Sequence, residues 1–87
     1  MKIAVWDTYV TKIDGSIMHF DIFAPDEIND PEVIYSFGKE YLFTKGQQGS
    51  PLSASQCNFC HIDKATPLVE QAISEKGYFI YEMEGCE

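Results

Sequence analysis

The chain has 87 residues, of which 45% are hydrophobic and 14% aromatic, so it has room for one hydrophobic core and we expect a single domain over residues 1–87. Fourteen acidic and six basic residues give a net charge of -8, which repels phosphate backbones and anionic membrane surfaces, so neither nucleic acid nor a membrane is an expected partner. No apolar run approaches the roughly 20 residues of a spanning helix or forms a signal peptide after Met1, which predicts a cytoplasmic protein.

Two strands are predicted at residues 2–11 and 16–24, which are rich in β-branched and aromatic side chains and flank the hairpin signal Asp14-Gly15. A three-residue loop, with Gly15 in the left-handed region, pairs residues of equal parity. A two-residue loop would instead spread polar residues over both faces of the hairpin. We therefore predict the three-residue loop and one buried, nearly apolar face made of Ala4, Trp6, Val10, Met18, Phe20, Ile22 and Ala24.

The first helix is predicted to begin after Asp30, because an N-capping Asp is followed by Pro31 at the first helical position. Apolar residues recur at helical spacing up to Tyr41, and we expect the helix to end near Gly46. Gly38 lies inside this helix, where Gly costs about 1 kcal/mol relative to Ala, so it indicates a close approach to the sheet. Residues 44–54 contain many turn formers and are predicted to form a mobile loop.

The sequence of the last third of the chain predicts a strand, then a helix, then a final strand. Residues 55–62 resemble a short strand, Thr66-Pro67 opens a second helix that ends at Gly77, and residues 78–83 form the last strand. The predicted fold is α+β in the order ββαβαβ, with two helices and a mixed four-stranded sheet. In that sheet the last two strands are parallel if they are neighbours.

Cys57, Cys60 and His61 form a Cys-x-x-Cys-His motif that admits four interpretations. Haem attachment is disfavoured because covalent haem is added outside the cytoplasm, and a dithiol redox site is disfavoured because the next helix starts only near Thr66. Zinc is the metal these ligands would select, with Cys86 as a fourth ligand if a parallel final strand ended beside them. The fourth interpretation is structural: both thiols are small buried groups of a reducing compartment, and they form no disulfide.

A second candidate cluster follows from the hairpin register, which places Tyr9 opposite His19 and Asp7 opposite Asp21 on the odd-numbered face. Directly opposed carboxylates repel each other. Such a pair is tolerated when it is solvated, when a cation lies between the two groups, or when one of them is protonated. The cluster is therefore either a wet sheet face or a site for a cation or for the positive group of a ligand.

Five sequence blocks in this order resemble a small bacterial family, the domain of unknown function two-thousand-and-twenty-four. The blocks span residues 5–10, 18–22, 37–42, 57–62 and 82–86. The resemblance implies a compact α+β fold without an assigned activity, and it transfers no catalytic or ligand-binding residue.

The sequence thus describes an uncharacterised small acidic protein, for which three functions compete. The first is a binding or protein-interaction module whose partly apolar odd face, with Ile3, Val5, Ile17 and Phe23, pairs with a second copy or with a protein partner. The second is a metal-binding protein that uses Cys57, Cys60, His61 and Cys86, or the harder donors of Asp7, His19 and Asp21. The third is an enzyme with its site at Asp7, His19 and Asp21.

Overall fold

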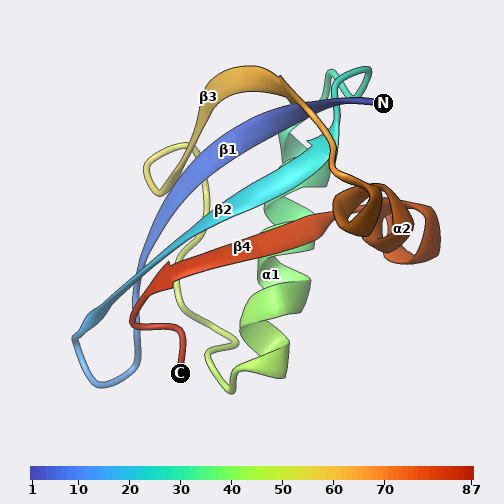
Figure 1. The fold of residues 1–87 in the computed structure, drawn as a ribbon. Helices are drawn as coiled ribbons and strands as arrows, with labels where there is room; N and C mark the ends of the chain where they lie inside the picture. The colour runs from blue at the N-terminus through green and yellow to red at the C-terminus, as the bar shows by residue number, and fades with distance from the viewer.

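The computed structural model describes residues 1–87 and contains six elements in the predicted ββαβαβ order. The four strands form one sheet with the order β3-β1-β2-β4. Helix α1 lies across one face of this sheet, and α2 lies at one end of the opposite face (Figure 1). The elements are β1 (Lys2–Thr11), β2 (Ile17–Pro25), α1 (Pro31–Thr44), β3 (Cys57–Lys64), α2 (Pro67–Lys76) and β4 (Phe79–Glu84).

The hairpin register of β1 and β2 is the predicted one. Thr11 pairs with Ile17, the Lys12 amide donates to the Ser16 carbonyl at 2.7 Å, and Gly15 adopts a φ of 89°. The three-residue loop therefore keeps pairs of equal parity along the whole ladder. The predicted apolar face is buried against α1, with Trp6 half-buried at its border.

Both helices begin and end as the sequence predicts. The Asp30 side chain accepts a hydrogen bond from the Glu32 amide, and the Thr66 side chain accepts one from the Val69 amide. Gly77 closes α2 in the left-handed conformation. Neither helix has the length and apolar character needed to cross a membrane.

The sheet is entirely antiparallel, whereas the sequence predicted a mixed sheet. Strand β3 pairs with β1 at one edge, and β4 pairs with β2 at the other edge, so β3 and β4 are not neighbours. The ten-residue helix α2 spans about 15 Å, but the eight residues of β3 span about 26 Å. Helix α2 therefore stays at the end of the sheet where β3 finishes, and β4 starts at that same end.

The connection over residues 45–56 consists of turns and is anchored to the core by Leu52, which is buried. Leu52 packs where α1 carries Gly38: a Cβ at Gly38 would lie 2.5 Å from Cδ1 of Leu52 and 3.1 Å from Cδ1 of Ile22. The predicted close approach of Gly38 to the sheet is confirmed by Ile22 of β2. Leu52 of the loop lies even closer to Gly38. The mobility of this loop stays a prediction.

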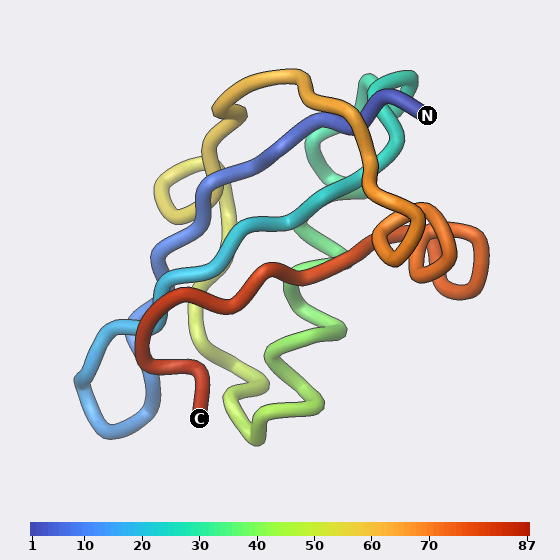
Figure 2. Tube along the Cα trace, in the orientation of Figure 1, coloured from blue at the N-terminus to red at the C-terminus, as the bar shows by residue number.

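The odd face of the sheet is covered at only one end. Val69 and Ile73 of α2 pack on Ile3 and Val5 and form a second, smaller core. The chain starts near α2 and finishes toward the hairpin end of the sheet (Figure 2). The odd face at the hairpin end carries no helix, and the second candidate cluster lies there.

Candidate functional site

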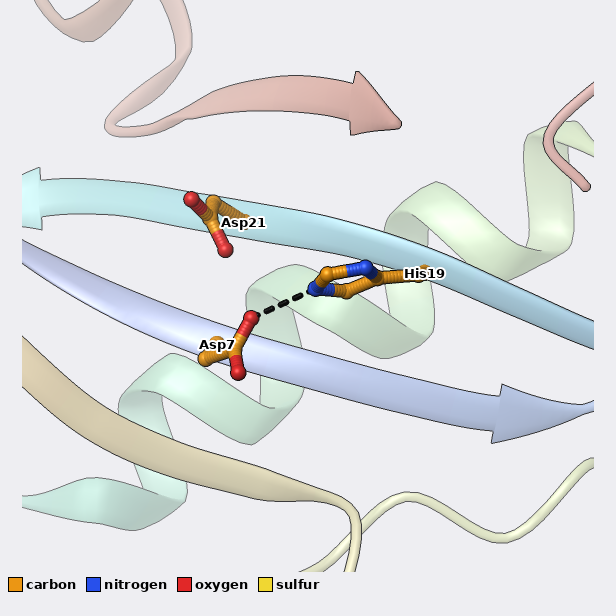
Figure 3. A group of neighbouring side chains, drawn as sticks. All are labelled: Asp7, His19 and Asp21. Carbon is orange, nitrogen blue, oxygen red and sulfur yellow. Dashed lines mark hydrogen bonds and ion pairs between the residues drawn. The ribbon is translucent and has the colours of Figure 1, made fainter. Parts of the chain in front are cut away.

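Asp7 of β1 and His19 and Asp21 of β2 converge on the uncovered part of the odd face (Figure 3). Asp7 pairs directly with Asp21, as the parity argument predicts, and His19 is one residue pair further toward the hairpin loop. One potential ligand atom from each of the three side chains lies within 4.8 Å of the other two. The ladder therefore gathers two carboxylates and one imidazole without help from any other element.

Asp21 is the most enclosed member of the cluster, with only 9% of its surface exposed. Its Oδ1 atom is fully buried and has no hydrogen-bond partner. Asp7 and His19 are half-buried, and His19 Nε2 lies 2.6 Å from Asp7 Oδ1. The cluster thus contains one satisfied pair and one buried carboxylate oxygen that no protein group satisfies.

The charges in the cluster disfavour ionisation of Asp21. Burial raises the pKa of the Asp21 carboxyl from 3.8 to about 6, and the neighbouring carboxylate of Asp7 acts in the same direction. The charges of His19 and His61 lower that pKa, but to a smaller extent. Near neutral pH, a positive group placed between the two carboxylates would relieve this repulsion.

The aromatic ring of Tyr9 fixes the imidazole of His19. The two rings stack at a centroid distance of 4.0 Å with an interplanar angle of 13°. The sequence left open whether His19 contacts Tyr9 or a carboxylate, and the structure gives it both contacts. Tyr9 itself makes no hydrogen bond to the cluster, so it acts as a stacking partner of His19.

The other candidate ligand set does not come together, because its members lie on different edges and faces of the sheet. Cys57 is buried at the β3 edge and receives a hydrogen bond from Thr8 Oγ1 at 3.4 Å. Cys86 follows β4 at the opposite edge and is also buried. Three strand spacings, about 14 Å, separate the two edges. The proposed fourth ligand was wrongly placed because it relied on a parallel final strand.

Cys60 and His61 are exposed on β3, and their side chains touch each other, which the sequence did not predict. A bulge between the partners of Val5 and Trp6 changes the register of β3, and His61 Nδ1 lies 3.2 Å from Cys60 Sγ. All three cysteines are free thiols. Asp63 Oδ2 lies 3.7 Å from the other ring nitrogen of His61, so Cys60 and Asp63 contact opposite sides of the imidazole and the three groups do not converge on one point.

A surface pocket of about 490 Å³ lies elsewhere, between α1 and the loop that follows it. Leu42, Phe43 and Leu52 supply its apolar wall, and Lys39 is its one ionisable lining group. It holds none of the candidate ligands, so the cluster on the hairpin is the stronger candidate for a functional site.

The fold and the cluster together define a small α+β domain that displays a carboxylate and imidazole group on a half-covered antiparallel sheet. The chain belongs to the family described as Domain of unknown function (DUF2024), whose model matches residues 1–83. It is similar over the full length of both chains to the solution structure of protein NE1680 from the bacterium Nitrosomonas europaea, a structural genomics target, with 44% identity and a TM-score of 0.86. No curated protein matches the chain.

Proposed function

We propose that this protein is a small binding module whose ligand carries positive charge, and that Asp7 and Asp21 hold this ligand on the uncovered part of the odd sheet face. The single observation that supports the proposal is the buried Oδ1 atom of Asp21, which has no hydrogen-bond partner and belongs to a carboxylate that faces a second carboxylate. Burying an unpaired carboxylate beside a like charge destabilises the fold, and a bound cation removes that penalty.

The protein itself supplies no lysine for this purpose. The chain has six lysines and no arginine, and none of its ion pairs joins a lysine to Asp7 or Asp21. His19 is the one basic side chain within hydrogen-bond distance, and it bonds to Asp7 and leaves Asp21 Oδ1 unpaired. An external positive group is the simplest way to complete the cluster.

The alternative surface for a protein partner is smaller than the sequence suggested. Ile3 and Val5, which were expected to make the odd face apolar, are buried under α2. Ile17 remains exposed beside the hairpin loop. Tyr9 and Tyr81, on the same face beside the cluster, are also exposed, so the surface left to a protein partner surrounds the two carboxylates and includes them.

An enzymatic function has less support from the same geometry. No hydroxyl or thiol donates a hydrogen bond to the side chains of Asp7, His19 or Asp21. The cluster thus offers no activated hydroxyl or thiol nucleophile, and the pocket that could enclose a substrate lies elsewhere, between α1 and the loop that follows it. Binding a cation needs no such group.

The test is thermal melting of wild type and Asp7→Asn with and without cations at neutral pH. We use two series, divalent metal chlorides and short alkylammonium chlorides. We expect at least one series to raise the melting temperature of wild type and to have a clearly smaller effect on Asp7→Asn. Asp26→Asn, which removes an exposed carboxylate before α1, is the matched control and should respond like wild type. If neither series changes the melting temperature of wild type, the proposal is wrong.

A further inference from the structure

We infer that the bound cation is a divalent transition metal, coordinated by one carboxylate oxygen from each of Asp7 and Asp21 and by Nε2 of His19. This inference rests on the proposed function and specifies its ligand. The three donor atoms lie within 4.8 Å of one another. Shifts of less than about 1 Å would bring them to the metal-ligand bond lengths of about 2.0 to 2.2 Å.

Asp21 provides the observation that distinguishes this cluster from an ordinary group of surface acids. The residue is nine-tenths buried, its Oδ1 has no partner, and one of its carboxylate oxygens points toward the gap between Asp7 and His19 (Figure 3). A buried polar group without a partner is rare in folded proteins. A metal ion is small enough to reach a carboxylate with so little exposed surface, whereas a bulkier organic headgroup has less access.

The imidazole is held in position for coordination before any metal binds. Stacking on Tyr9 fixes the plane of the His19 ring, and Nε2 points at Asp7 Oδ1 from 2.6 Å. A metal that enters the gap would take the place of the proton between these two atoms, and that proton would move to Nδ1 of His19 or leave to water, so that both atoms become ligands. The structure thus assigns Tyr9 as a positioning residue, because its ring contacts a ligand but not the metal.

The donor set selects a class of metal. Two carboxylate oxygens and one imidazole nitrogen suit Mn²⁺, Fe²⁺, Co²⁺ and Zn²⁺. Calcium and magnesium prefer an all-oxygen shell, and Cu⁺ prefers sulfur. All three ligands come from one face of one hairpin, so the solvent side of the metal carries only water, and a chelator should remove the metal readily.

The experiment measures metal affinity on tag-free protein that has been stripped with a chelator. Calorimetric titrations at pH 7.5 compare Mn²⁺, Co²⁺ and Zn²⁺ with Mg²⁺, Ca²⁺ and ethylammonium. We expect binding of the transition metals, with at least tenfold lower affinity for Mg²⁺ and Ca²⁺. His19→Gln and Asp21→Asn each remove a proposed ligand and should weaken Co²⁺ binding by at least 10-fold. Loss of a residue that only supports a ligand already weakens metal binding by about 10-fold to 100-fold. Tyr9→Leu should weaken it less.

The matched control is His61→Ala, which removes the other histidine of the chain from the neighbouring strand β3. It should change the Co²⁺ affinity far less than His19→Gln does, because His61 acts on Asp21 only through its charge. Wild-type protein also allows a test without mutation. In a two-dimensional amide NMR spectrum, Mn²⁺ should broaden the signals of residues 7, 19 and 21 before those of residues 60 and 61.

Each of the other outcomes overturns the inference in a distinguishable way. Binding of ethylammonium without any transition metal would leave the proposed function standing and refute the metal. Binding of neither would refute both. Two results would place the site on β3 instead. One is metal binding that is kept in His19→Gln and lost in His61→Ala, and the other is Mn²⁺ broadening centred on residues 60 and 61.

Discussion

Asp21 shows how strand pairing can force an unfavourable environment on a single residue. The ladder places its carboxylate directly opposite that of Asp7, and burial with the nearby negative charge raises its pKa to about 6. Unfolding returns the group to water, where its ordinary pKa is 3.8. Between about pH 4 and pH 6 the folded state therefore binds a proton that the unfolded state does not.

The sign of the resulting pH dependence is the reverse of common acid denaturation. Because the folded-state pKa of Asp21 is raised, the free energy of unfolding of metal-free wild type should increase as the pH falls from 7.5 to 5.5. With a pKa of about 6 in the folded state and 3.8 in the unfolded state, the increase over this range should be about 0.8 kcal/mol, because the full effect of about 3 kcal/mol is reached only below pH 4. Urea denaturation at several pH values measures it. Asp21→Asn should be more stable than wild type at pH 7.5 and should lose most of the pH dependence.

The control for this prediction is Asp26→Asn, which should keep the pH dependence of wild type because Asp26 is exposed. The assignment of the effect to Asp21 would be contradicted if the free energy of unfolding stays constant or decreases on acidification. In that case wild type and Asp21→Asn would show the same pH dependence.

The three cysteines should differ in reactivity although none is paired. Cys57 and Cys86 are 2% and 6% exposed, burial raises the pKa of the Cys57 thiol, and Cys60 is exposed beside His61. Thiol titration of native protein should therefore give one fast-reacting group, which Cys60→Ser removes, and two that react only on unfolding. Detection of fewer than three thiols in reduced, denatured protein, or of two fast groups in native protein, would be inconsistent with this assignment.

At the scale of elements, the packing of α1 on the sheet depends on Gly38. Alanine is favoured over glycine in a helix by about 1 kcal/mol, yet a Cβ here would collide with Leu52 and press on Ile22. We expect Gly38→Ala to lower the free energy of unfolding by about 1 to 3 kcal/mol, because overpacking outweighs helix propensity. Chemical denaturation measures the change.

Two further variants separate the collision from other effects of the substitution. Ser36→Ala, on the exposed side of the same helix, should change stability by less than about 0.5 kcal/mol. In the double variant with Leu52→Ala, the cost of Gly38→Ala should shrink, since the nearest colliding atom is gone. Equal costs of Gly38→Ala in both backgrounds would refute the collision.

At the scale of the whole molecule, a metal bound to the hairpin should stabilise the entire domain. Because β1 and β2 are the two central strands, opening the site requires disrupting the sheet. Free Co²⁺ at 100 times its dissociation constant should add about 2.7 kcal/mol to the free energy of unfolding and raise the melting temperature by about 10 to 20 °C. Thermal melting followed by circular dichroism tests this expectation.

The choice of Co²⁺ or Mn²⁺ over Zn²⁺ matters for that measurement. The unfolded chain presents Cys57, Cys60 and His61 as a flexible ligand set, and zinc bound there would stabilise the unfolded state. His19→Gln should reduce the shift strongly. A metal that binds the native protein in calorimetry and leaves the melting temperature unchanged would show that the site lies outside the cooperative sheet.

Much of this protein is determined by local sequence. The hairpin register follows from a three-residue loop and the parity of the apolar residues, and Asp7, His19 and Asp21 are brought together by that register alone. The helix ends follow from capping at Asp30 and Thr66, since a cap acts on neighbouring amides. A candidate site on two consecutive strands can therefore be predicted without knowing the rest of the fold.

Other features were decided only by the tertiary structure, because they depend on contacts between distant segments. Helix α2 is short enough to remain at one end of the sheet, and this sends β4 to the edge opposite β3 and separates Cys86 from Cys60. The same helix buries Ile3 and Val5 and leaves the carboxylates uncovered. Strand parity assigns a residue to a face, but only the packing of the helices determines which part of that face remains open to a ligand.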